Sequence, residues 1–156
     1  MSLLRGGGDI IALAIALLWR GATAALHGDH DRAEQALDEA LGLASTIHDP
    51  ELAAAMSARA MSNLGIAAHA HGDFDTAVHR HEMALRTCRE HGYLLGAVRA
   101  LRDLGDVARD WGDSMASLAY YRECLSSLGE QGDLRVVIDA LVGAALAAVA
   151  WGQSQR

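Results

Sequence analysis

The stretch AHGDFDTAVHRHEMAL, residues 70–85, decides the fold because a similar block occurs twice more in the chain. The other two copies are LHGDHDRAEQALDEAL at 26–41 and DWGDSMASLAYYRECL at 110–125. Each block holds a Gly-Asp pair, and the glycines at 28, 72, 112 and 152 follow one another at intervals of 44, 40 and 40 residues. A period near forty, with helix-forming sequence on both sides of the glycine, predicts stacked helical hairpins rather than a globule with one central site.

Glycine and aspartate mark the expected helix ends. A glycine in the left-handed conformation closes a helix without a Cβ clash, and the aspartate after it caps the next helix. Pro50 after Asp49 suits a first helical position. We therefore predict an all-α superhelix (a solenoid) of about seven antiparallel helices, at residues 10–27, 30–47, 50–71, 74–90, 93–111, 114–130 and 133–151. The single domain over 9–151 divides into repeats 9–48, 49–91 and 92–131 and a trailing helix 132–151, between a flexible lead-in 1–8 and a tail 152–156.

The register also predicts how the helices pack. Gly21, Gly65 and Gly105 take equivalent places in the first helices of the three hairpins, where a glycine lets two helix backbones approach closely. The second helices alternate small and large positions at helical spacing, so that their ridges fit neighbouring grooves. The large positions are Leu37, His81 and Tyr121, and the small ones include Ala40, Ala84 and Cys124.

Composition limits the class of protein. The chain of 156 residues carries 20 acidic residues against 13 cationic ones, all of them Arg, for a net charge of −7. Nucleic-acid binding needs a basic surface, so we expect no direct nucleic-acid partner. Cys88 and Cys124 show no disulfide spacing in a chain too large to need one, which favours reduced thiols and a cytoplasmic location.

The apolar run from Ile10 to Trp19 has two interpretations. It resembles the core of a signal peptide, but Asp9 and Arg20 flank it and it falls where the repeat needs a first helix. The run is too short to span a bilayer. We favour a repeat helix capped by Asp9, and expect no membrane partner.

These residues resemble the tetratricopeptide repeat (TPR) family. The family pattern of Leu-Gly, Gly-Asp, Ala and Ala-Leu matches best in the second repeat, at Leu64-Gly65, Gly72-Asp73, Ala77 and Ala84-Leu85. His81 departs from the large apolar residue that is usual there, and Arg20 precedes Gly21 in place of Leu. The resemblance covers about residues 9–151 and implies the solenoid fold, while a motif of this kind does not specify one function.

A narrower likeness concerns the forty-residue spacing and the segments 89–113 and 129–156. They look like the C-terminal TPR arrays of large bacterial LuxR-type, ATP-dependent transcription regulators. The likeness implies a non-catalytic sensory or interaction array of a transcription or signalling regulator. The alternative is a stand-alone TPR scaffold that assembles proteins. The chain shows no phosphate-binding loop and no basic recognition helix, so it is either an excised array or a free-standing one.

In TPR superhelices the groove is lined by outward residues of the first helices. The register places four arginines from two adjacent helices there, and an arginine fork suits carboxylates and phosphates. The hypothesis is a groove that holds a protein or peptide partner, or a small anion. The alternative is an ordinary solvated lattice of ion pairs. The candidate groove residues are Arg59, Asn63, His69, Arg99, Arg102, Asp103, Asp106 and Arg109.

No enzymatic or metal chemistry is expected. Ser, His and Asp are present without a nucleophile elbow or triad spacing. His69, His71, His79 and His81 cluster in sequence, but rings two residues apart on a helix point in nearly opposite directions and cannot chelate. We interpret His81 as a core residue and His79 as a surface one. We therefore predict no catalytic residues, no metal and no cofactor.

The first and last predicted helices carry apolar residues on faces that no other predicted helix of this chain covers. A helix that is apolar on every face is expected to be buried. We predict a homodimer or an end-to-end stack through the terminal helices, with truncation of a longer protein as the alternative. The candidate interface residues are Leu18, Trp19, Val142, Leu146, Val149 and Trp151.

Overall fold

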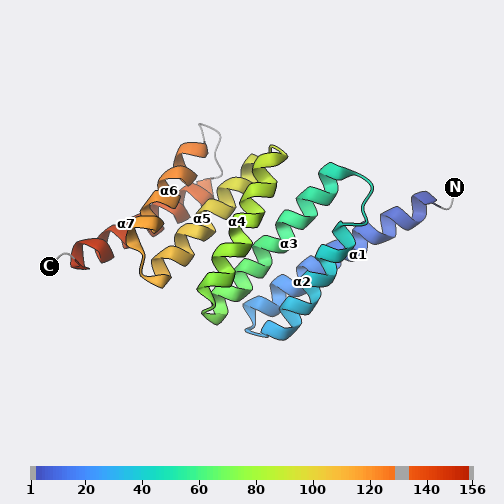
Figure 1. The fold of residues 1–156 in the computed structure, drawn as a ribbon, viewed down its shortest axis with the longest axis horizontal. Helices are drawn as coiled ribbons and strands as arrows, with labels where there is room; N and C mark the ends of the chain where they lie inside the picture. The colour runs from blue at the N-terminus through green and yellow to red at the C-terminus, as the bar shows by residue number, and fades with distance from the viewer. Residues whose placement is uncertain (1–2, 129–133, 155–156) are drawn as a thin grey trace.

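The computed structural model describes residues 3–128 and 134–154, and every regular element in these ranges is an α-helix. Helices α1 to α6 form three hairpins, and α7 follows them (Figure 1). The helices are α1 Leu3–Leu26, α2 His30–Ala44, α3 Pro50–His71, α4 Phe74–Glu90, α5 Leu94–Trp111, α6 Ser114–Ser127 and α7 Leu134–Ser154.

The helices stand in one elongated row with the two ends of the chain at opposite ends of the array (Figure 1). Each helix packs against the next one in sequence, and α1, α3, α5 and α7 also contact one another in that order. Within the described residues, no Cα atom of α2 lies within 8 Å of α4 and none of α4 lies within 8 Å of α6, although the side chain of Arg89 on α4 pairs with Glu123 on α6. The array therefore curves toward the layer of α1, α3, α5 and α7, which forms its inner face, as in solenoids with a concave binding surface.

The turns within hairpins have the predicted chemistry. Gly72 and Gly112 end α3 and α5 in the left-handed conformation, with φ of 83° and 93°. The side chains of Asp29, Asp73 and Asp113 each accept a hydrogen bond from the backbone N–H three residues later. Each turn thus satisfies backbone groups that a helix end leaves without partners.

A large side chain fills the space above a glycine in every hairpin. A Cβ added to Gly65 would lie 2.7 Å from the ring of His81, and one added to Gly105 would lie 2.7 Å from the ring of Tyr121. Leu37 meets Gly21 in the same way, at 2.4 Å. The predicted close approach is therefore confirmed, and the large residue of the second helix is what occupies it.

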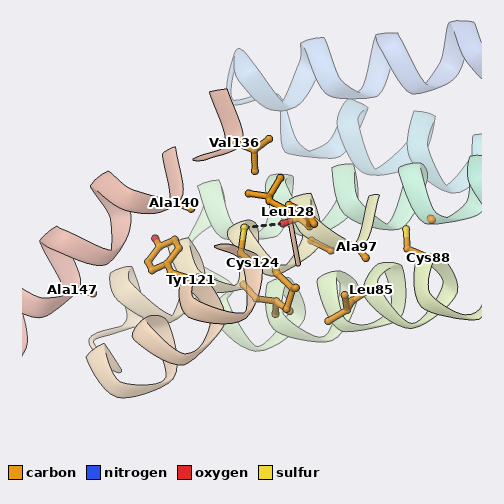
Figure 2. Close-up of a cluster of buried hydrophobic side chains, with 14 residues drawn as sticks. Leu85, Cys88, Ala97, Tyr121, Cys124, Leu128, Val136, Ala140 and Ala147 are labelled. Carbon is orange, nitrogen blue, oxygen red and sulfur yellow. Dashed lines mark hydrogen bonds between the residues drawn. The ribbon is translucent and has the colours of Figure 1, made fainter. Parts of the chain in front are cut away.

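The core is a chain of clusters rather than one centre. The largest cluster joins α4, α5, α6 and α7 and includes Tyr121, Cys124 and Val136 (Figure 2). Cys124 is completely buried and its thiol lies 3.4 Å from the carbonyl oxygen of Val98. Cys88 is also buried, and neither of the two cysteines forms a disulfide in the structure.

Several predicted boundaries are wrong at the ends of the chain. Helix α1 begins at Leu3, so residues 3–8 are helical rather than a lead-in and Asp9 is not a cap. Helix α7 continues to Ser154, so most of the expected tail at 152–156 is helix. The low helix propensity of glycine predicts helix ends near Gly8 and Gly152, but a helix that has already formed extends through a single glycine at a cost of about 1 kcal/mol. Gly8, Asp9 and Gly152 are exposed, so packing does not hold these ends. The predicted turn at Gly132-Asp133 lies outside the described residues.

Candidate ligand-binding groove

A pocket of about 440 Å³ opens on the inner face between α3 and α5 and reaches α4 and α7. Four arginines line it: Arg59 from α3, Arg99 and Arg102 from α5, and Arg135 from the first turn of α7. The other polar side chains of the lining are Ser62, Asn63, Tyr93 and Asp103. The remaining lining residues are small or apolar, namely Ala55, Ala58, Ile66, Ala84, Cys88, Gly96 and Val136.

One arginine of the pocket is held by carboxylates. The guanidinium of Arg102 donates to Asp103 Oδ1 at 2.6 Å through Nη2 and lies 3.5 Å from Asp139 Oδ2 on α7. Burial lowers the pKa of Arg102, but the charge and hydrogen bond of Asp103 together with the charges of Asp106 and Asp139 outweigh it, and the resulting pKa lies above the ordinary value. Arg102 therefore stays charged and links α5 to α7.

Asp103 is a buried acid, contrary to its predicted place on the open groove. It is 7% exposed, the Ser62 hydroxyl lies 3.5 Å from its Oδ2, and its side chain reaches toward His81 at 4.0 Å. The position faces inward because α5 packs against four helices, α3, α4, α6 and α7. The buried carboxylate of Asp103 is compensated by its ion pair with Arg102.

Arg59 connects the pocket to the first hairpin. Its guanidinium carbon lies 5.5 Å from the ring centroid of Trp19 on α1, within the range of a cation–π contact. Trp19 is 62% exposed, so the pair extends the polar wall of the pocket with an aromatic surface.

The remaining predicted groove residues form a separate ion-pair network near the carboxyl end of α5. Arg109 contacts Asp106 at 2.7 Å and Asp110 at 2.9 Å, and His69 on α3 lies 3.0 Å from Asp110. Asp106 also accepts a hydrogen bond of 2.6 Å from the hydroxyl of Tyr121. Ten residues separate Arg99 from Arg109, about 15 Å along a helix, so the eight candidates divide into two groups.

The structure thus brings Arg59, Asn63, Arg99, Arg102 and Asp103 together at the pocket and separates His69, Asp106 and Arg109 from them. Arg102 and Arg109 are held in ion pairs, as the alternative interpretation expects, while ligand binding by the arginines of the pocket stays a prediction. Arg135 lines the pocket but is not among the predicted groove residues. The sequence could have indicated it, because Arg135 is the one arginine of a mostly apolar helix, in the first turn, and that helix packs beside α5.

The terminal faces are only partly as predicted. Leu18 is 4% exposed and belongs to the cluster formed with α2 and α3, so it is not part of a free surface. Leu18 was predicted to be exposed, but α1 contacts both α2 and α3, and two neighbouring helices bury a wider part of its surface than one would. The other predicted interface residues, Trp19, Val142, Leu146, Val149 and Trp151, are exposed.

Two helical segments are long and apolar enough to span a membrane by length and composition alone: Gly8–Leu26 and Leu134–Ser154. The first segment includes the apolar run at 10–19, which by itself is too short to span a bilayer. The segment is longer because the helix continues without a break to Leu26. About a quarter of each segment is buried inside the array, 28% and 22% respectively.

His81 and His79 lie where the sequence predicts. His81 is completely buried and His79 is exposed. In the part of the chain that the structure describes, no group of three or more His, Cys, Asp or Glu side chains is placed to hold a metal ion.

Comparisons with known proteins agree with this geometry. A family model described as "Tetratricopeptide repeat" matches residues 12–90 and 57–130. The crystal structure of a TPR-like protein from Chlorobium tepidum TLS is similar with a TM-score of 0.67 and 18% identity, over 89% of this chain and 96% of that one. A structure called DHF46 filament gives a TM-score of 0.47 and 21% identity, over 95% and 90%. Among curated proteins, none matches the chain.

Proposed function

The chain belongs to the tetratricopeptide repeat family, and from that premise we propose that it is the sensory or interaction array of a bacterial transcription or signalling regulator. TPR modules generally serve as scaffolds for protein–protein interaction, and the fold is typically non-catalytic. The inner face would receive a protein or peptide partner that carries an acidic group, with no cofactor, and the protein would act in the cytoplasm.

The charge of the pocket carries the proposal. Its lining holds four arginines and one aspartate, a surplus of three positive charges, in a chain whose net charge is −7. Local charge opposite to that of the whole molecule attracts a partner of the opposite sign to this one place. Guanidinium groups also bind carboxylates with two parallel hydrogen bonds, which gives orientation as well as affinity. Asn63 adds an amide that can pair with a peptide backbone.

The first prediction concerns acidic peptides. A peptide that ends in two acidic residues with a free carboxyl terminus is expected to bind, and its affinity is expected to fall about tenfold when Arg59 and Arg99 are both changed to Gln. Isothermal titration calorimetry measures both affinities. Arg122→Gln, an exposed arginine of α6 outside the pocket lining, is the matched control and is expected to leave binding unchanged. Equal binding by the wild type and the double variant contradicts the proposal.

The regulator context has its own test. A pull-down from the native host is expected to recover partners whose binding depends on Arg59 and Arg99. A reading frame that places an NTPase module and a DNA-binding helix-turn-helix on the same polypeptide supports the regulator. If the native polypeptide lacks both modules and still binds partners, the stand-alone scaffold is supported instead.

We also propose self-association through the terminal helices. Leu141, Val142, Leu146 and Val149 are each more than half exposed on the side of α7 that faces away from the array. Together with Leu134, Ile138 and Trp151 they leave on the order of 700 Å² of apolar surface, close to the ~800 Å² that each partner of a stable interface buries. Paired copies of α7, or α7 against α1 of the next copy, would cover it.

The second prediction is therefore an oligomer that a charge on α7 disrupts. The wild type is expected to elute above the monomer mass in size-exclusion chromatography with light scattering, and Leu146→Glu to elute as a monomer. Leu95→Glu, an equally exposed leucine of α5, is the control and is expected to leave the mass unchanged. A monomeric wild type at micromolar concentration, or one that binds lipid vesicles through α7, contradicts self-association.

A further inference from the structure

The pocket between α3 and α5 has two parts of different chemistry. Its inner wall consists of buried apolar side chains, among them Ala58, Ala84 and Cys88 (Figure 2 labels Cys88 on α4). Its rim carries the exposed arginines Arg59 and Arg99. Ala58, Ala84 and Cys88 are at most 4% exposed, so the inner wall offers apolar contact and presents almost no surface to water.

The inner wall leaves room because its residues are small. Ala55, Ala58 and Ala84 stand where larger side chains would fill the space between α3, α4 and α5. The helices cannot close it by moving together at the inner end, because a Cβ on Gly96 would already lie 2.5 Å from the Sγ of Cys88. The volume of about 440 Å³ lies within the range of about 300–1,000 Å³ that is common for small-molecule sites.

The fourth helix of the inner face completes the enclosure. Arg135 and Val136 of α7 line the pocket side by side, one exposed and one buried, so that α7 contributes to both the rim and the inner wall. Arg102 joins α7 to α5 through Asp139. An extended peptide along the inner face would use the rim, whereas a compact molecule can use both parts.

We propose that this pocket binds a small amphipathic anion, with a carboxylate or phosphate head between the arginines of the rim and an apolar body of several carbon atoms against the inner wall. The proposal rests on the proposed function in one respect, since the same pocket receives an acidic group. It goes further by assigning the apolar part of the ligand to the space bounded by Ala58, Ala84 and Cys88.

A series of four probes tests both halves of the ligand by calorimetric titration of the full chain. Hexanoate has the head and the body, acetate has only the head, hexanamide has the body without the charge, and hexyl phosphate replaces the head. Hexanoate or hexyl phosphate is expected to bind about tenfold more tightly than acetate and hexanamide. Whichever of the two binds more tightly identifies the head group. Equal affinity of hexanamide and hexanoate, or of acetate and hexanoate, overturns the proposal.

Variants locate the site. Changing Arg99 and Arg135 together to Gln is expected to weaken the tighter of the two anionic probes about tenfold, while Arg122→Gln leaves it unchanged. The two cysteines give a second measurement that needs no variant. The bound probe is expected to slow alkylation of Cys88, which lines the pocket, and to leave the rate at Cys124, buried elsewhere, unchanged.

The outcomes separate the two proposals. If acidic peptides bind and no amphipathic probe protects Cys88, the small-ligand proposal fails and the proposed function stands. If neither peptides nor probes bind, both fail.

Discussion

Replacing Tyr121 with Ala is expected to lower the free energy of unfolding by about 3–5 kcal/mol, the range for removing a fully buried aromatic ring. Tyr121 is completely buried and its ring touches the bare backbone of Gly105 on α5 and of Gly143 on α7. No side chain on either glycine can relax into the space. The loss would therefore leave a cavity at the place where α5, α6 and α7 meet, and urea unfolding measures the cost.

Two further variants separate the ring of Tyr121 from its hydroxyl. The hydroxyl donates to Asp106 at 2.6 Å and accepts from Arg109 at 3.0 Å, and burial raises the pKa of Tyr121 so that it remains protonated. Tyr121→Phe is expected to cost about 1 kcal/mol, since Asp106 and Arg109 still pair. Tyr120→Ala, its half-buried neighbour, is the control. A cost for Tyr121→Ala no larger than that of the control contradicts the role of the ring.

Acid is expected to destabilise the fold through His81. Burial lowers the pKa of His81 below its ordinary value of 6.5, Asp103 opposes that shift, and His69 and Arg102 add to it. Between the lowered folded pKa and 6.5, the unfolded chain binds a proton that the folded chain does not. The free energy of unfolding therefore falls as the pH falls through that window. Neither ring nitrogen of His81 has a hydrogen-bond partner among the described residues.

His81→Leu tests this account, because Leu37 fills the same position above Gly21 in the first hairpin. The variant is expected to be about 1 kcal/mol more stable than the wild type at pH 7, where an unpaired buried group is removed. The difference is expected to be larger at pH 5 than at pH 7, measured by urea unfolding at both pH values. His79→Gln removes an exposed histidine from the same helix and serves as the control. A difference between His81→Leu and wild type that does not depend on pH refutes the role of His81.

Only some of the residues that line the pocket could be predicted from the sequence. Arg59 and Arg99 were placed together correctly because they occupy related positions in adjacent repeats, and the repeat period relates such positions in space. Asp103 was placed on the open face, although it is buried. Helical spacing gives the direction of a side chain on its own helix, but which helices cover that direction depends on the packing of α3, α4, α6 and α7 around α5.

Local chemistry was enough to determine the repeat, the turns at Gly72 and Gly112, and the small and large positions, because caps and left-handed glycines act within a few residues. Packing alone decided that Leu18 is buried and that Arg135 belongs to the pocket. Each of these depends on which helices lie beside a residue. Contacts between residues more than thirty positions apart are fixed only when the hairpins stack, and the pocket between them exists only in that stacked arrangement.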